Sequence, residues 1–145
     1  MKIKNNTLVF NKKKTKINEF SYNEQIVQLE LGEKVKKLSR MSFAGCRSIE
    51  AVKFNNRLEE IEYGAFYNCS FLTEINIPDG ITAINPRTFE DCTSLKNIII
   101  PDSVTFIGST AFENCTSLTS ITIPDSVTSI GYSAFSGCSS LETIT

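Results

Sequence analysis

The chain has 145 residues, 41% of them hydrophobic, and a formal net charge of −1 at pH 7. These values predict a single soluble domain with enough apolar residues for a core. The sequence has no histidine, no G-x-S-x-G segment and no glycine-rich phosphate loop. A nucleophile would therefore lack its usual base, and we expect no enzymatic activity.

Residues 1–28 are predicted to form an N-terminal capping coil. Within it, the polar segment KIKNNTLVFNKKKTKI (residues 2–17) is predicted to form a hairpin that turns at Asn5-Asn6. Eleven of the 15 Lys and Arg residues lie before residue 48, against four acidic residues there. A basic N-terminal end could bind nucleic acid. The run KKKTK has no interleaved aromatic residue, however, so we interpret it as a solvated turn beside an edge strand and expect no nucleic-acid partner.

From Leu29 onward the sequence repeats with a period of 23 residues. Five sets of aliphatic residues recur at this interval, and each set is called a column here. A phenylalanine column consists of Phe43, Phe66, Phe89, Phe112 and Phe135. A cysteine column consists of Cys46, Cys69, Cys92, Cys115 and Cys138. A strict period of this length indicates a solenoid, because one coil cannot bury its own apolar face and must stack on its neighbours. Residues 29–145 then hold five 23-residue repeats and the first two residues of a sixth.

Each repeat is predicted to contain three elements. The segment LTSITIPDS (residues 118–126) has the L-x-x-L-x-L pattern of a short parallel strand, which proline ends because it has no amide hydrogen. VTSIG (127–131) is predicted to cross the back in extended form, and SAFSGC (133–138) to form one turn of helix. The predicted fold class is an α/β-type, β-rich repeat solenoid, with parallel strands on one face and short extended or helical turns on the back.

The unit resembles the repeat of the BspA-like branch of the leucine-rich repeat family, which is close to L-x-x-I-x-I-P-x-x-V-x-x-I-G-x-x-A-F-x-x-C-x-x. Two segments, IIIPDSVTFIGSTAFENCTSL (98–118) and ITIPDSVTSIGYSAFSGCSSL (121–141), follow it almost without change. The earliest repeats depart from it, with Gly32 and Asn55 where later repeats have proline. The resemblance implies a curved array whose strands line a concave face, a binding role, and a secreted or cell-surface location.

The five cysteines allow three interpretations. Disulfides need side chains that face one another, whereas equivalent positions on stacked coils point the same way about 5 Å apart. Zinc needs four ligands around a tetrahedron, which a straight row without histidine does not provide. We therefore predict a column of reduced, buried thiols, with no metal and no other cofactor.

A mostly acidic column follows the predicted strands, and carboxylates a few ångströms apart could share a calcium ion. Turn capping explains the same column, because the turn itself is repeated, and we favour that interpretation. The column consists of Glu33, Asn56, Asp79, Asp102 and Asp125.

The residues between the inward columns vary from coil to coil and are predicted to face outward on the concave surface. The candidate partner-binding residues there are Glu30, Glu50, Lys53, Thr73, Glu74, Asn76, Lys96, Asn97, Ile99, Thr119 and Thr122. Aromatic residues, which often carry binding energy at interfaces, also replace smaller or polar ones elsewhere in the repeat, at Tyr63, Tyr67, Phe71, Phe106 and Tyr132.

The sequence therefore predicts a non-enzymatic protein-interaction or adhesion-type module with a protein partner. The alternative is a structural spacer within a longer solenoid. Leu141 and Ile144 belong to columns without a next member, so we expect an uncapped C-terminal end that supports self-association. The start MKIKNNTLVF lacks the apolar run of a signal peptide, and we expect no membrane insertion.

Overall fold

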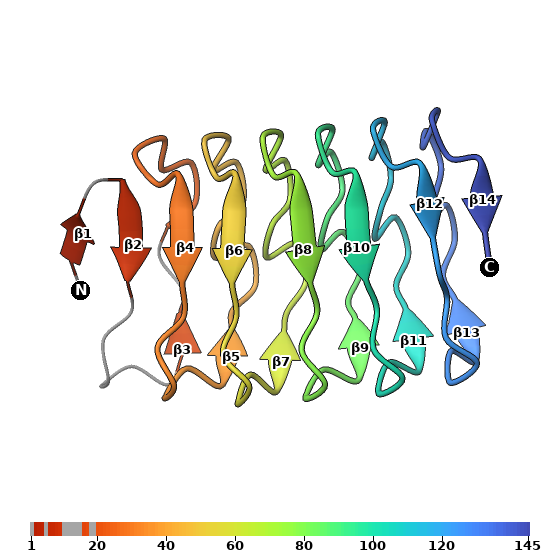
Figure 1. The fold of residues 1–145 in the computed structure, drawn as a ribbon, viewed down its shortest axis with the longest axis horizontal. Coiled ribbons are helices and arrows are strands. Elements are labelled where there is room, and N and C mark those ends of the chain that lie inside the picture. The colour runs from red at the N-terminus through yellow and green to blue at the C-terminus, as the bar shows by residue number, and fades with distance from the viewer. Residues whose placement is uncertain (1, 5, 10–15, 18–19) are drawn as a thin grey trace.

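The computed structural model describes residues 2–4, 6–9, 16–17 and 20–145. The chain forms a solenoid whose coils stack along one axis, with main strands on one side and shorter strands behind them (Figure 1). In each coil a lower turn follows the main strand, the short strand returns behind it, and an upper loop leads to the next coil (Figure 1). Asn5, where the hairpin was predicted to turn, and most of the basic run, residues 12–15, lie outside the described residues.

From β4 onward the paired main strands keep the 23-residue period in their register, whereas β2 and β4 pair with an offset of 21 residues, Leu8 opposite Leu29. Leu29 lies opposite Val52, and Ile75 lies opposite Ile98. All neighbouring pairs are parallel except the first, in which β1 is antiparallel to β2. The main strands are β1 (Lys2–Lys4), β2 (Thr7–Val9), β4 (Gln28–Glu30), β6 (Ala51–Lys53), β8 (Glu74–Asn76), β10 (Asn97–Ile99), β12 (Ser120–Ile121) and β14 (Thr143–Ile144). The predicted parallel-strand solenoid is confirmed.

The short strands confirm the prediction that the chain crosses the back in extended form. Each has two residues. Their pairs are parallel and keep the 23-residue period from β5 onward, as in Ile107 opposite Ile130, whereas β3 and β5 pair with an offset of 21 residues. The strands are β3 (Lys16–Ile17), β5 (Lys37–Leu38), β7 (Glu60–Ile61), β9 (Ala83–Ile84), β11 (Phe106–Ile107) and β13 (Ser129–Ile130). The N-terminal strands β2 and β3 pair in parallel with β4 and β5, so these two strands stack on the next coil as the later strands do.

Each row of strands contains one break. In front, β1-β2-β4-β6-β8-β10 form one sheet and β12-β14 another, and behind, β3-β5-β7 is separate from β9-β11-β13. The break behind coincides with Asn85, whose Nδ2 donates to the Ile61 carbonyl at 2.7 Å. At the equivalent position one coil later, the main-chain amide of Gly108 donates to the Ile84 carbonyl at 2.7 Å. A side-chain hydrogen bond thus replaces a main-chain one where the sheet divides.

A stack of phenylalanine rings runs through the core. Consecutive ring centroids from Phe20 to Phe135 lie 5.4 to 5.8 Å apart, with interplanar angles of 6 to 14°. The rings of Phe43 and Phe66 are fully buried, as are those of Phe89 and Phe112. Offset stacked rings contribute about 0.5–1.5 kcal/mol per pair beyond their burial, so the stack ties each coil to the next.

The predicted turn of helix in each repeat is wrong, because the described residues contain no helix, and the fold is a β-solenoid rather than an α/β array. The upper loop of the last coil instead has positive φ at Ser133 (54°) and Gly137 (73°), a conformation that interrupts an α-helix. Other loop amides bond to the next coil, as in Phe112 to the Ala134 carbonyl at 2.8 Å. The described part of the chain accordingly has no helical segment with the length and hydrophobicity of a membrane span.

The five cysteines are not joined in disulfides, and all are buried except Cys138, which is partly exposed. Each thiol donates to the main-chain carbonyl of the phenylalanine in the previous coil, for example from Cys69 to Phe43 with Sγ and oxygen 3.2 Å apart. Burial raises the pKa of these thiols, to about 11 for Cys46. The side chains thus add a weak cross-coil hydrogen bond beside the stacked rings.

Candidate functional site

The main strand face is defined here as the outward side chains of β4, β6, β8, β10 and β12, the residue before each of these strands, and Thr122, which directly follows β12. This face includes all the predicted partner-binding residues. Ten of these eleven side chains are exposed, and Glu30 is half-buried. The residues between them, such as Leu29, Ile75 and Ile98, are buried. This alternation is the pattern of strands with one buried face.

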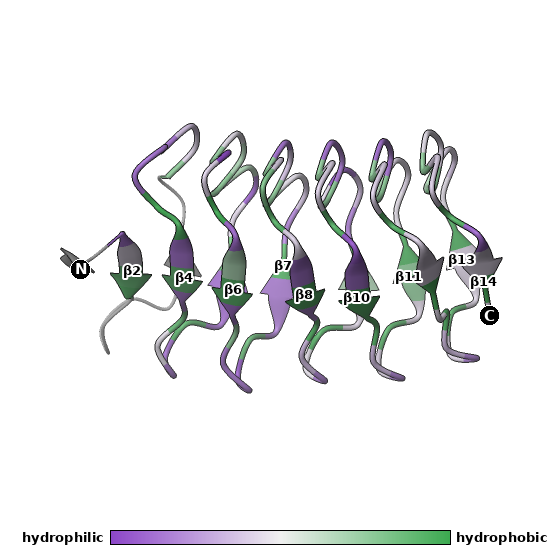
Figure 2. Cartoon of the chain, turned by 45° about the horizontal axis from the view of Figure 1, so that its top comes forward, coloured by the Kyte–Doolittle hydropathy of each residue, from purple (hydrophilic) through white to green (hydrophobic). Residues whose placement is uncertain are grey.

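Five of the candidate residues line one shallow depression across β8, β10 and β12, with a volume of about 470 Å³. The depression is lined by Glu74, Asn76, Asn97, Ile99 and Thr122, with Ser120 and the edges of Ile98 and Ile121. Ser120 occupies the same outward column as Glu74 and Asn97 but was not among the candidate residues. Ile99 is 64% exposed. In Figure 2 the strand β10 is hydrophilic at its start and hydrophobic at its tip. The depression therefore surrounds one exposed aliphatic side chain with polar groups.

The depression lies over the break between β10 and β12. One coil earlier, the Ile77 amide donates to the Ile99 carbonyl at 3.1 Å. The corresponding bond, from the Ile100 amide to the Thr122 carbonyl, is not formed within the described residues. A main-chain donor that has no partner in the ladder must be satisfied by solvent or by a ligand.

The other six candidate residues lie elsewhere on the main strand face. Lys53 and Glu30 form an exposed ion pair across β4 and β6, with Nζ and Oε1 3.0 Å apart. They line a second depression of about 430 Å³ together with Asn56 and Arg57. Such an exposed pair contributes little to stability, but it neutralises both charges. The remaining candidates line neither depression: Glu50, Thr73, Lys96 and Thr119.

Negative charge predominates at the larger depression. Glu74 is the one charged side chain that lines it, and it makes no ion pair in the described part of the chain. Residues 48–145 as a whole carry twelve acidic residues against four basic ones. An exposed carboxylate in an acidic region attracts a cationic group.

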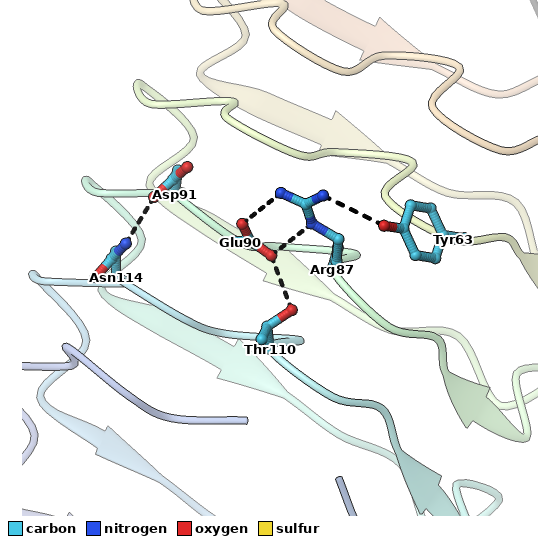
Figure 3. A network of polar contacts seen from close by, with 6 residues as sticks. All are labelled: Tyr63, Arg87, Glu90, Asp91, Thr110 and Asn114. Atoms are coloured by element: carbon cyan, nitrogen blue, oxygen red, sulfur yellow. Dashed lines mark hydrogen bonds and ion pairs between the residues drawn. The ribbon is translucent and has the colours of Figure 1, made fainter. Parts of the chain in front are cut away.

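A second cluster, in the upper loops, is built from residues of three consecutive coils (Figure 3). Arg87 donates from Nε and Nη2 to Glu90 at 2.8 and 2.7 Å, and from Nη1 to the Tyr63 hydroxyl at 3.3 Å. The Thr110 hydroxyl donates to Glu90 at 2.8 Å, and the Arg87 guanidinium lies 4.7 Å from the Tyr67 ring centroid. The polar groups of this cluster satisfy one another.

The sequence pointed to the two tyrosines of this cluster but missed its charged residues. The available signal was the three-residue spacing of Arg87 and Glu90, which places a cation and a carboxylate in one loop. Figure 3 also shows Asp91, which accepts from Nδ2 of Asn114 at 2.9 Å, again between coils. The cluster fixes the relative position of neighbouring coils.

The acidic column lies along the lower turns. No three His, Cys, Asp or Glu side chains of the described residues gather closely enough to hold a metal ion. The neighbouring serines bond between coils, since Ser103 donates to the Ile81 carbonyl and Ser126 to the Val104 carbonyl, each at 2.7 Å. Polar side chains of these turns therefore connect the coils.

Solved structures of longer proteins share this fold. A leucine rich cell surface protein from Faecalibacterium prausnitzii is 36% identical, with a TM-score of 0.82 over 90% of this chain and 36% of its own. A leucine-rich repeat protein from T. pallidum is 32% identical, with a TM-score of 0.79 over 81% of this chain and 57% of its own. A leucine-rich repeat protein from Bacteroides ovatus is 34% identical, with a TM-score of 0.79 over 94% of this chain and 38% of its own. The chain thus spans between about a third and three fifths of their lengths.

No curated protein sequence matches the chain. The sequence profile of the BspA type leucine rich repeat region matches residues 4–145 in six copies. The match includes the N-terminal coil as well as the regular repeats. The chain therefore belongs to the BspA-type leucine-rich repeat family.

Proposed function

We propose that this chain is a non-enzymatic protein-interaction module of the adhesion type, and that it binds its partner on the main strand face. The observation that carries the proposal is the depression over β8, β10 and β12. It gathers five of the eleven predicted residues, the exposed Ile99 and four polar or charged residues around it. Exposed polar groups around one large apolar side chain are the composition of a small protein-binding site.

The comparison with the cell surface protein from Faecalibacterium prausnitzii supports an extracellular or surface-exposed setting for this binding. A rigid sheet also suits recognition, because its outward side chains can vary without disturbing the core that holds them. The thiols of the core are buried or partly buried and donate to carbonyls. Their proposed role is structural.

Capture of partners by matched variants tests the proposal. The chain is immobilised and exposed to surface and secreted proteins of cells that express it. A strand-face variant carries Glu74→Gln, Asn76→Ala, Asn97→Ala and Ile99→Thr. A control variant carries Asp102→Asn and Thr82→Ala, both on exposed residues outside the depression. We expect the control to retain a partner that the strand-face variant loses, with both variants folded.

A structural spacer is the alternative function. The main strand face of a spacer has no partner, so the strand-face variant and the control would then retain the same proteins, or none. That result would reject the proposed binding role. Circular dichroism and thermal unfolding of both variants keep the comparison interpretable, since substitutions of exposed residues usually change stability by about 0.5 kcal/mol or less.

A further inference from the structure

We infer that the depression over β8, β10 and β12 binds an extended basic segment of a protein partner. One aliphatic side chain of the segment packs on Ile99, and one Lys or Arg lies against Glu74. This inference rests on the proposed function and specifies the chemistry of the partner at the same site. Hydrogen bonding, apolar contact and charge support it separately.

The hydrogen-bonding groups of the depression match a peptide main chain. The amides of Asn76 and Asn97 each donate and accept, as do the hydroxyls of Ser120 and Thr122. An extended peptide offers alternating N–H and C=O groups, so it can satisfy donors and acceptors spread across three strands.

The apolar contact is restricted to one position. In the outward column that contains Ile99, the previous coil has Asn76 and the next coil has Thr122. The neighbours of Ile99 in the depression are polar, apart from the edges of Ile98 and Ile121. A single exposed aliphatic group on a polar face favours a partner with one matching aliphatic side chain.

The charge indicates a basic segment. Glu74 is unpaired among the described residues, and residues 48–145 carry a net charge of −8 from twelve acidic and four basic residues. Lys96 precedes β10 but does not line the depression. A nucleic-acid backbone would be repelled here, and no aromatic ring lines the depression to stack on a base.

Peptide selection tests this inference directly. A phage-displayed library of random dodecapeptides is selected on the folded chain and, in parallel, on the Glu74→Gln, Ile99→Thr double variant. We expect the peptides specific to the unsubstituted chain to combine Lys or Arg with Ile, Leu or Val. Selection of acidic peptides, of peptides without a charge preference, or of no peptide at all would overturn the inference.

Single variants then separate the two contacts. Binding of the tightest synthetic dodecapeptide is measured by fluorescence anisotropy at low salt and at about 0.5 M salt. We expect Glu74→Gln to weaken binding about threefold to fivefold at low salt and to reduce the salt dependence. We expect Ile99→Thr to weaken it about tenfold at both salt concentrations. Asp102→Asn and Thr82→Ala should change it less than about twofold.

Methylation of the peptide tests the main-chain contacts. N-methyl groups introduced one at a time should weaken binding at one or more central positions, because each removes a donor. Equal binding of all methylated peptides would contradict an extended peptide held by its main chain.

The proposed function and this inference can fail separately. If the captured partner needs the main strand face but basic peptides do not compete with it, the inference is wrong and the proposed function stands. The same conclusion holds if an oligosaccharide competes instead. If Glu74→Gln and Ile99→Thr affect neither the partner nor any peptide, both are wrong.

Discussion

Arg87 and Glu90 form a two-point ion pair within one upper loop, with nitrogen to oxygen distances of 2.7 and 2.8 Å. The Arg87 main chain has φ of 61°, a conformation that costs a residue other than glycine about 1 kcal/mol or more. The pair is joined to Tyr63 in the previous coil and Thr110 in the next. The cross-coil hydrogen bonds offset this strain.

Replacing Glu90 by Gln should destabilise the protein by about 1–2 kcal/mol, because Glu90 is 8% exposed and accepts from two side chains. This loss of stability is smaller than the loss expected on breaking a fully buried ion pair, because the Arg87 side chain is 37% exposed and solvent screens its charge. Urea unfolding at pH 7 measures the change. Glu113→Gln, at the same position one coil later, is the control and should change stability by less than about 0.5 kcal/mol.

The effect of Glu90→Gln should depend on pH. Burial acts to raise the pKa of Glu90, but hydrogen bonds from Arg87 and Thr110 outweigh burial and lower the pKa below its ordinary value of 4.5. The stabilisation is therefore complete above pH 4.5 and is lost as the pH falls through the folded-state pKa. Urea unfolding at successively lower pH should show the difference between the two proteins shrinking. A constant difference would contradict the assignment.

Gly108→Ala should destabilise the protein by about 1–3 kcal/mol. A Cβ atom at Gly108 would lie 2.7 Å from Pro86 Cα and 2.7 Å from the Asn85 carbonyl carbon, which belong to the main chain of the previous coil and cannot rotate away. Thermal unfolding measures the loss. Asn85→Gly is the matched control and should cost less than about 1 kcal/mol, since a main-chain bond to Ile61 can replace the lost side-chain bond. Equal losses would show that close packing does not determine the spacing of the coils.

The thiols should differ in reactivity along the column. Burial raises the pKa of Cys69 and Cys92 well above the ordinary value and also raises that of Cys138, which is only partly buried. Because the thiolate is the reactive form, Cys138 should react first with a thiol reagent and the other four only on unfolding. Mass spectrometry of timed samples identifies the modified positions. Rapid modification of Cys92 in the folded protein would contradict its burial.

The isolated chain of residues 1–145 should self-associate through its C-terminal coil. Ile130 and Ile144 are 48% and 54% exposed, Tyr132 is 85% exposed, and β14 pairs only with β12 among the described strands. An exposed strand edge beside apolar side chains favours pairing with another copy. Light scattering over a concentration series should show the mass rising.

The combined variant Ile130→Thr, Tyr132→Ser, Ile144→Thr tests whether this coil is responsible for the self-association. It should reduce the association, whereas Phe71→Ser, which removes an exposed ring in an upper loop, should not. A mass that stays at one chain throughout the series would contradict this prediction.

The repeating core could be predicted from sequence because a strict period determines which residues meet. Phe43 and Phe66 had to stack once both occupied the same position in successive coils. The upper loop could not be predicted in the same way, because its amides alternate between two kinds of acceptor. Some bond to the carbonyl three residues back, as Cys69 does to Phe66, and others bond to the next coil, as Phe66 does to Thr88. A local pattern such as Ser133 to Cys138 resembles a helix end when cross-coil hydrogen bonds are unknown.

The candidate residues of the main strand face were also predictable, but their grouping was not. Alternation along a strand predicts that Asn97 and Ile99 face outward, and both do. The depression lies over β8, β10 and β12, and no residue type in the repeat signals that the sheet divides between β10 and β12. The Arg87 and Glu90 pair was missed for a related reason, since the loop conformation brings the two side chains together.

The most direct test of binding on the main strand face is an NMR titration of the ¹⁵N-labelled chain with the captured partner. We predict that the largest amide shifts fall in β8, β10 and β12, which line the depression. Smaller shifts should reach β4 and β6 on the same face. Shifts concentrated in the upper loops around Tyr63 and Arg87, or in the coil of Ile130 and Ile144, would contradict the account.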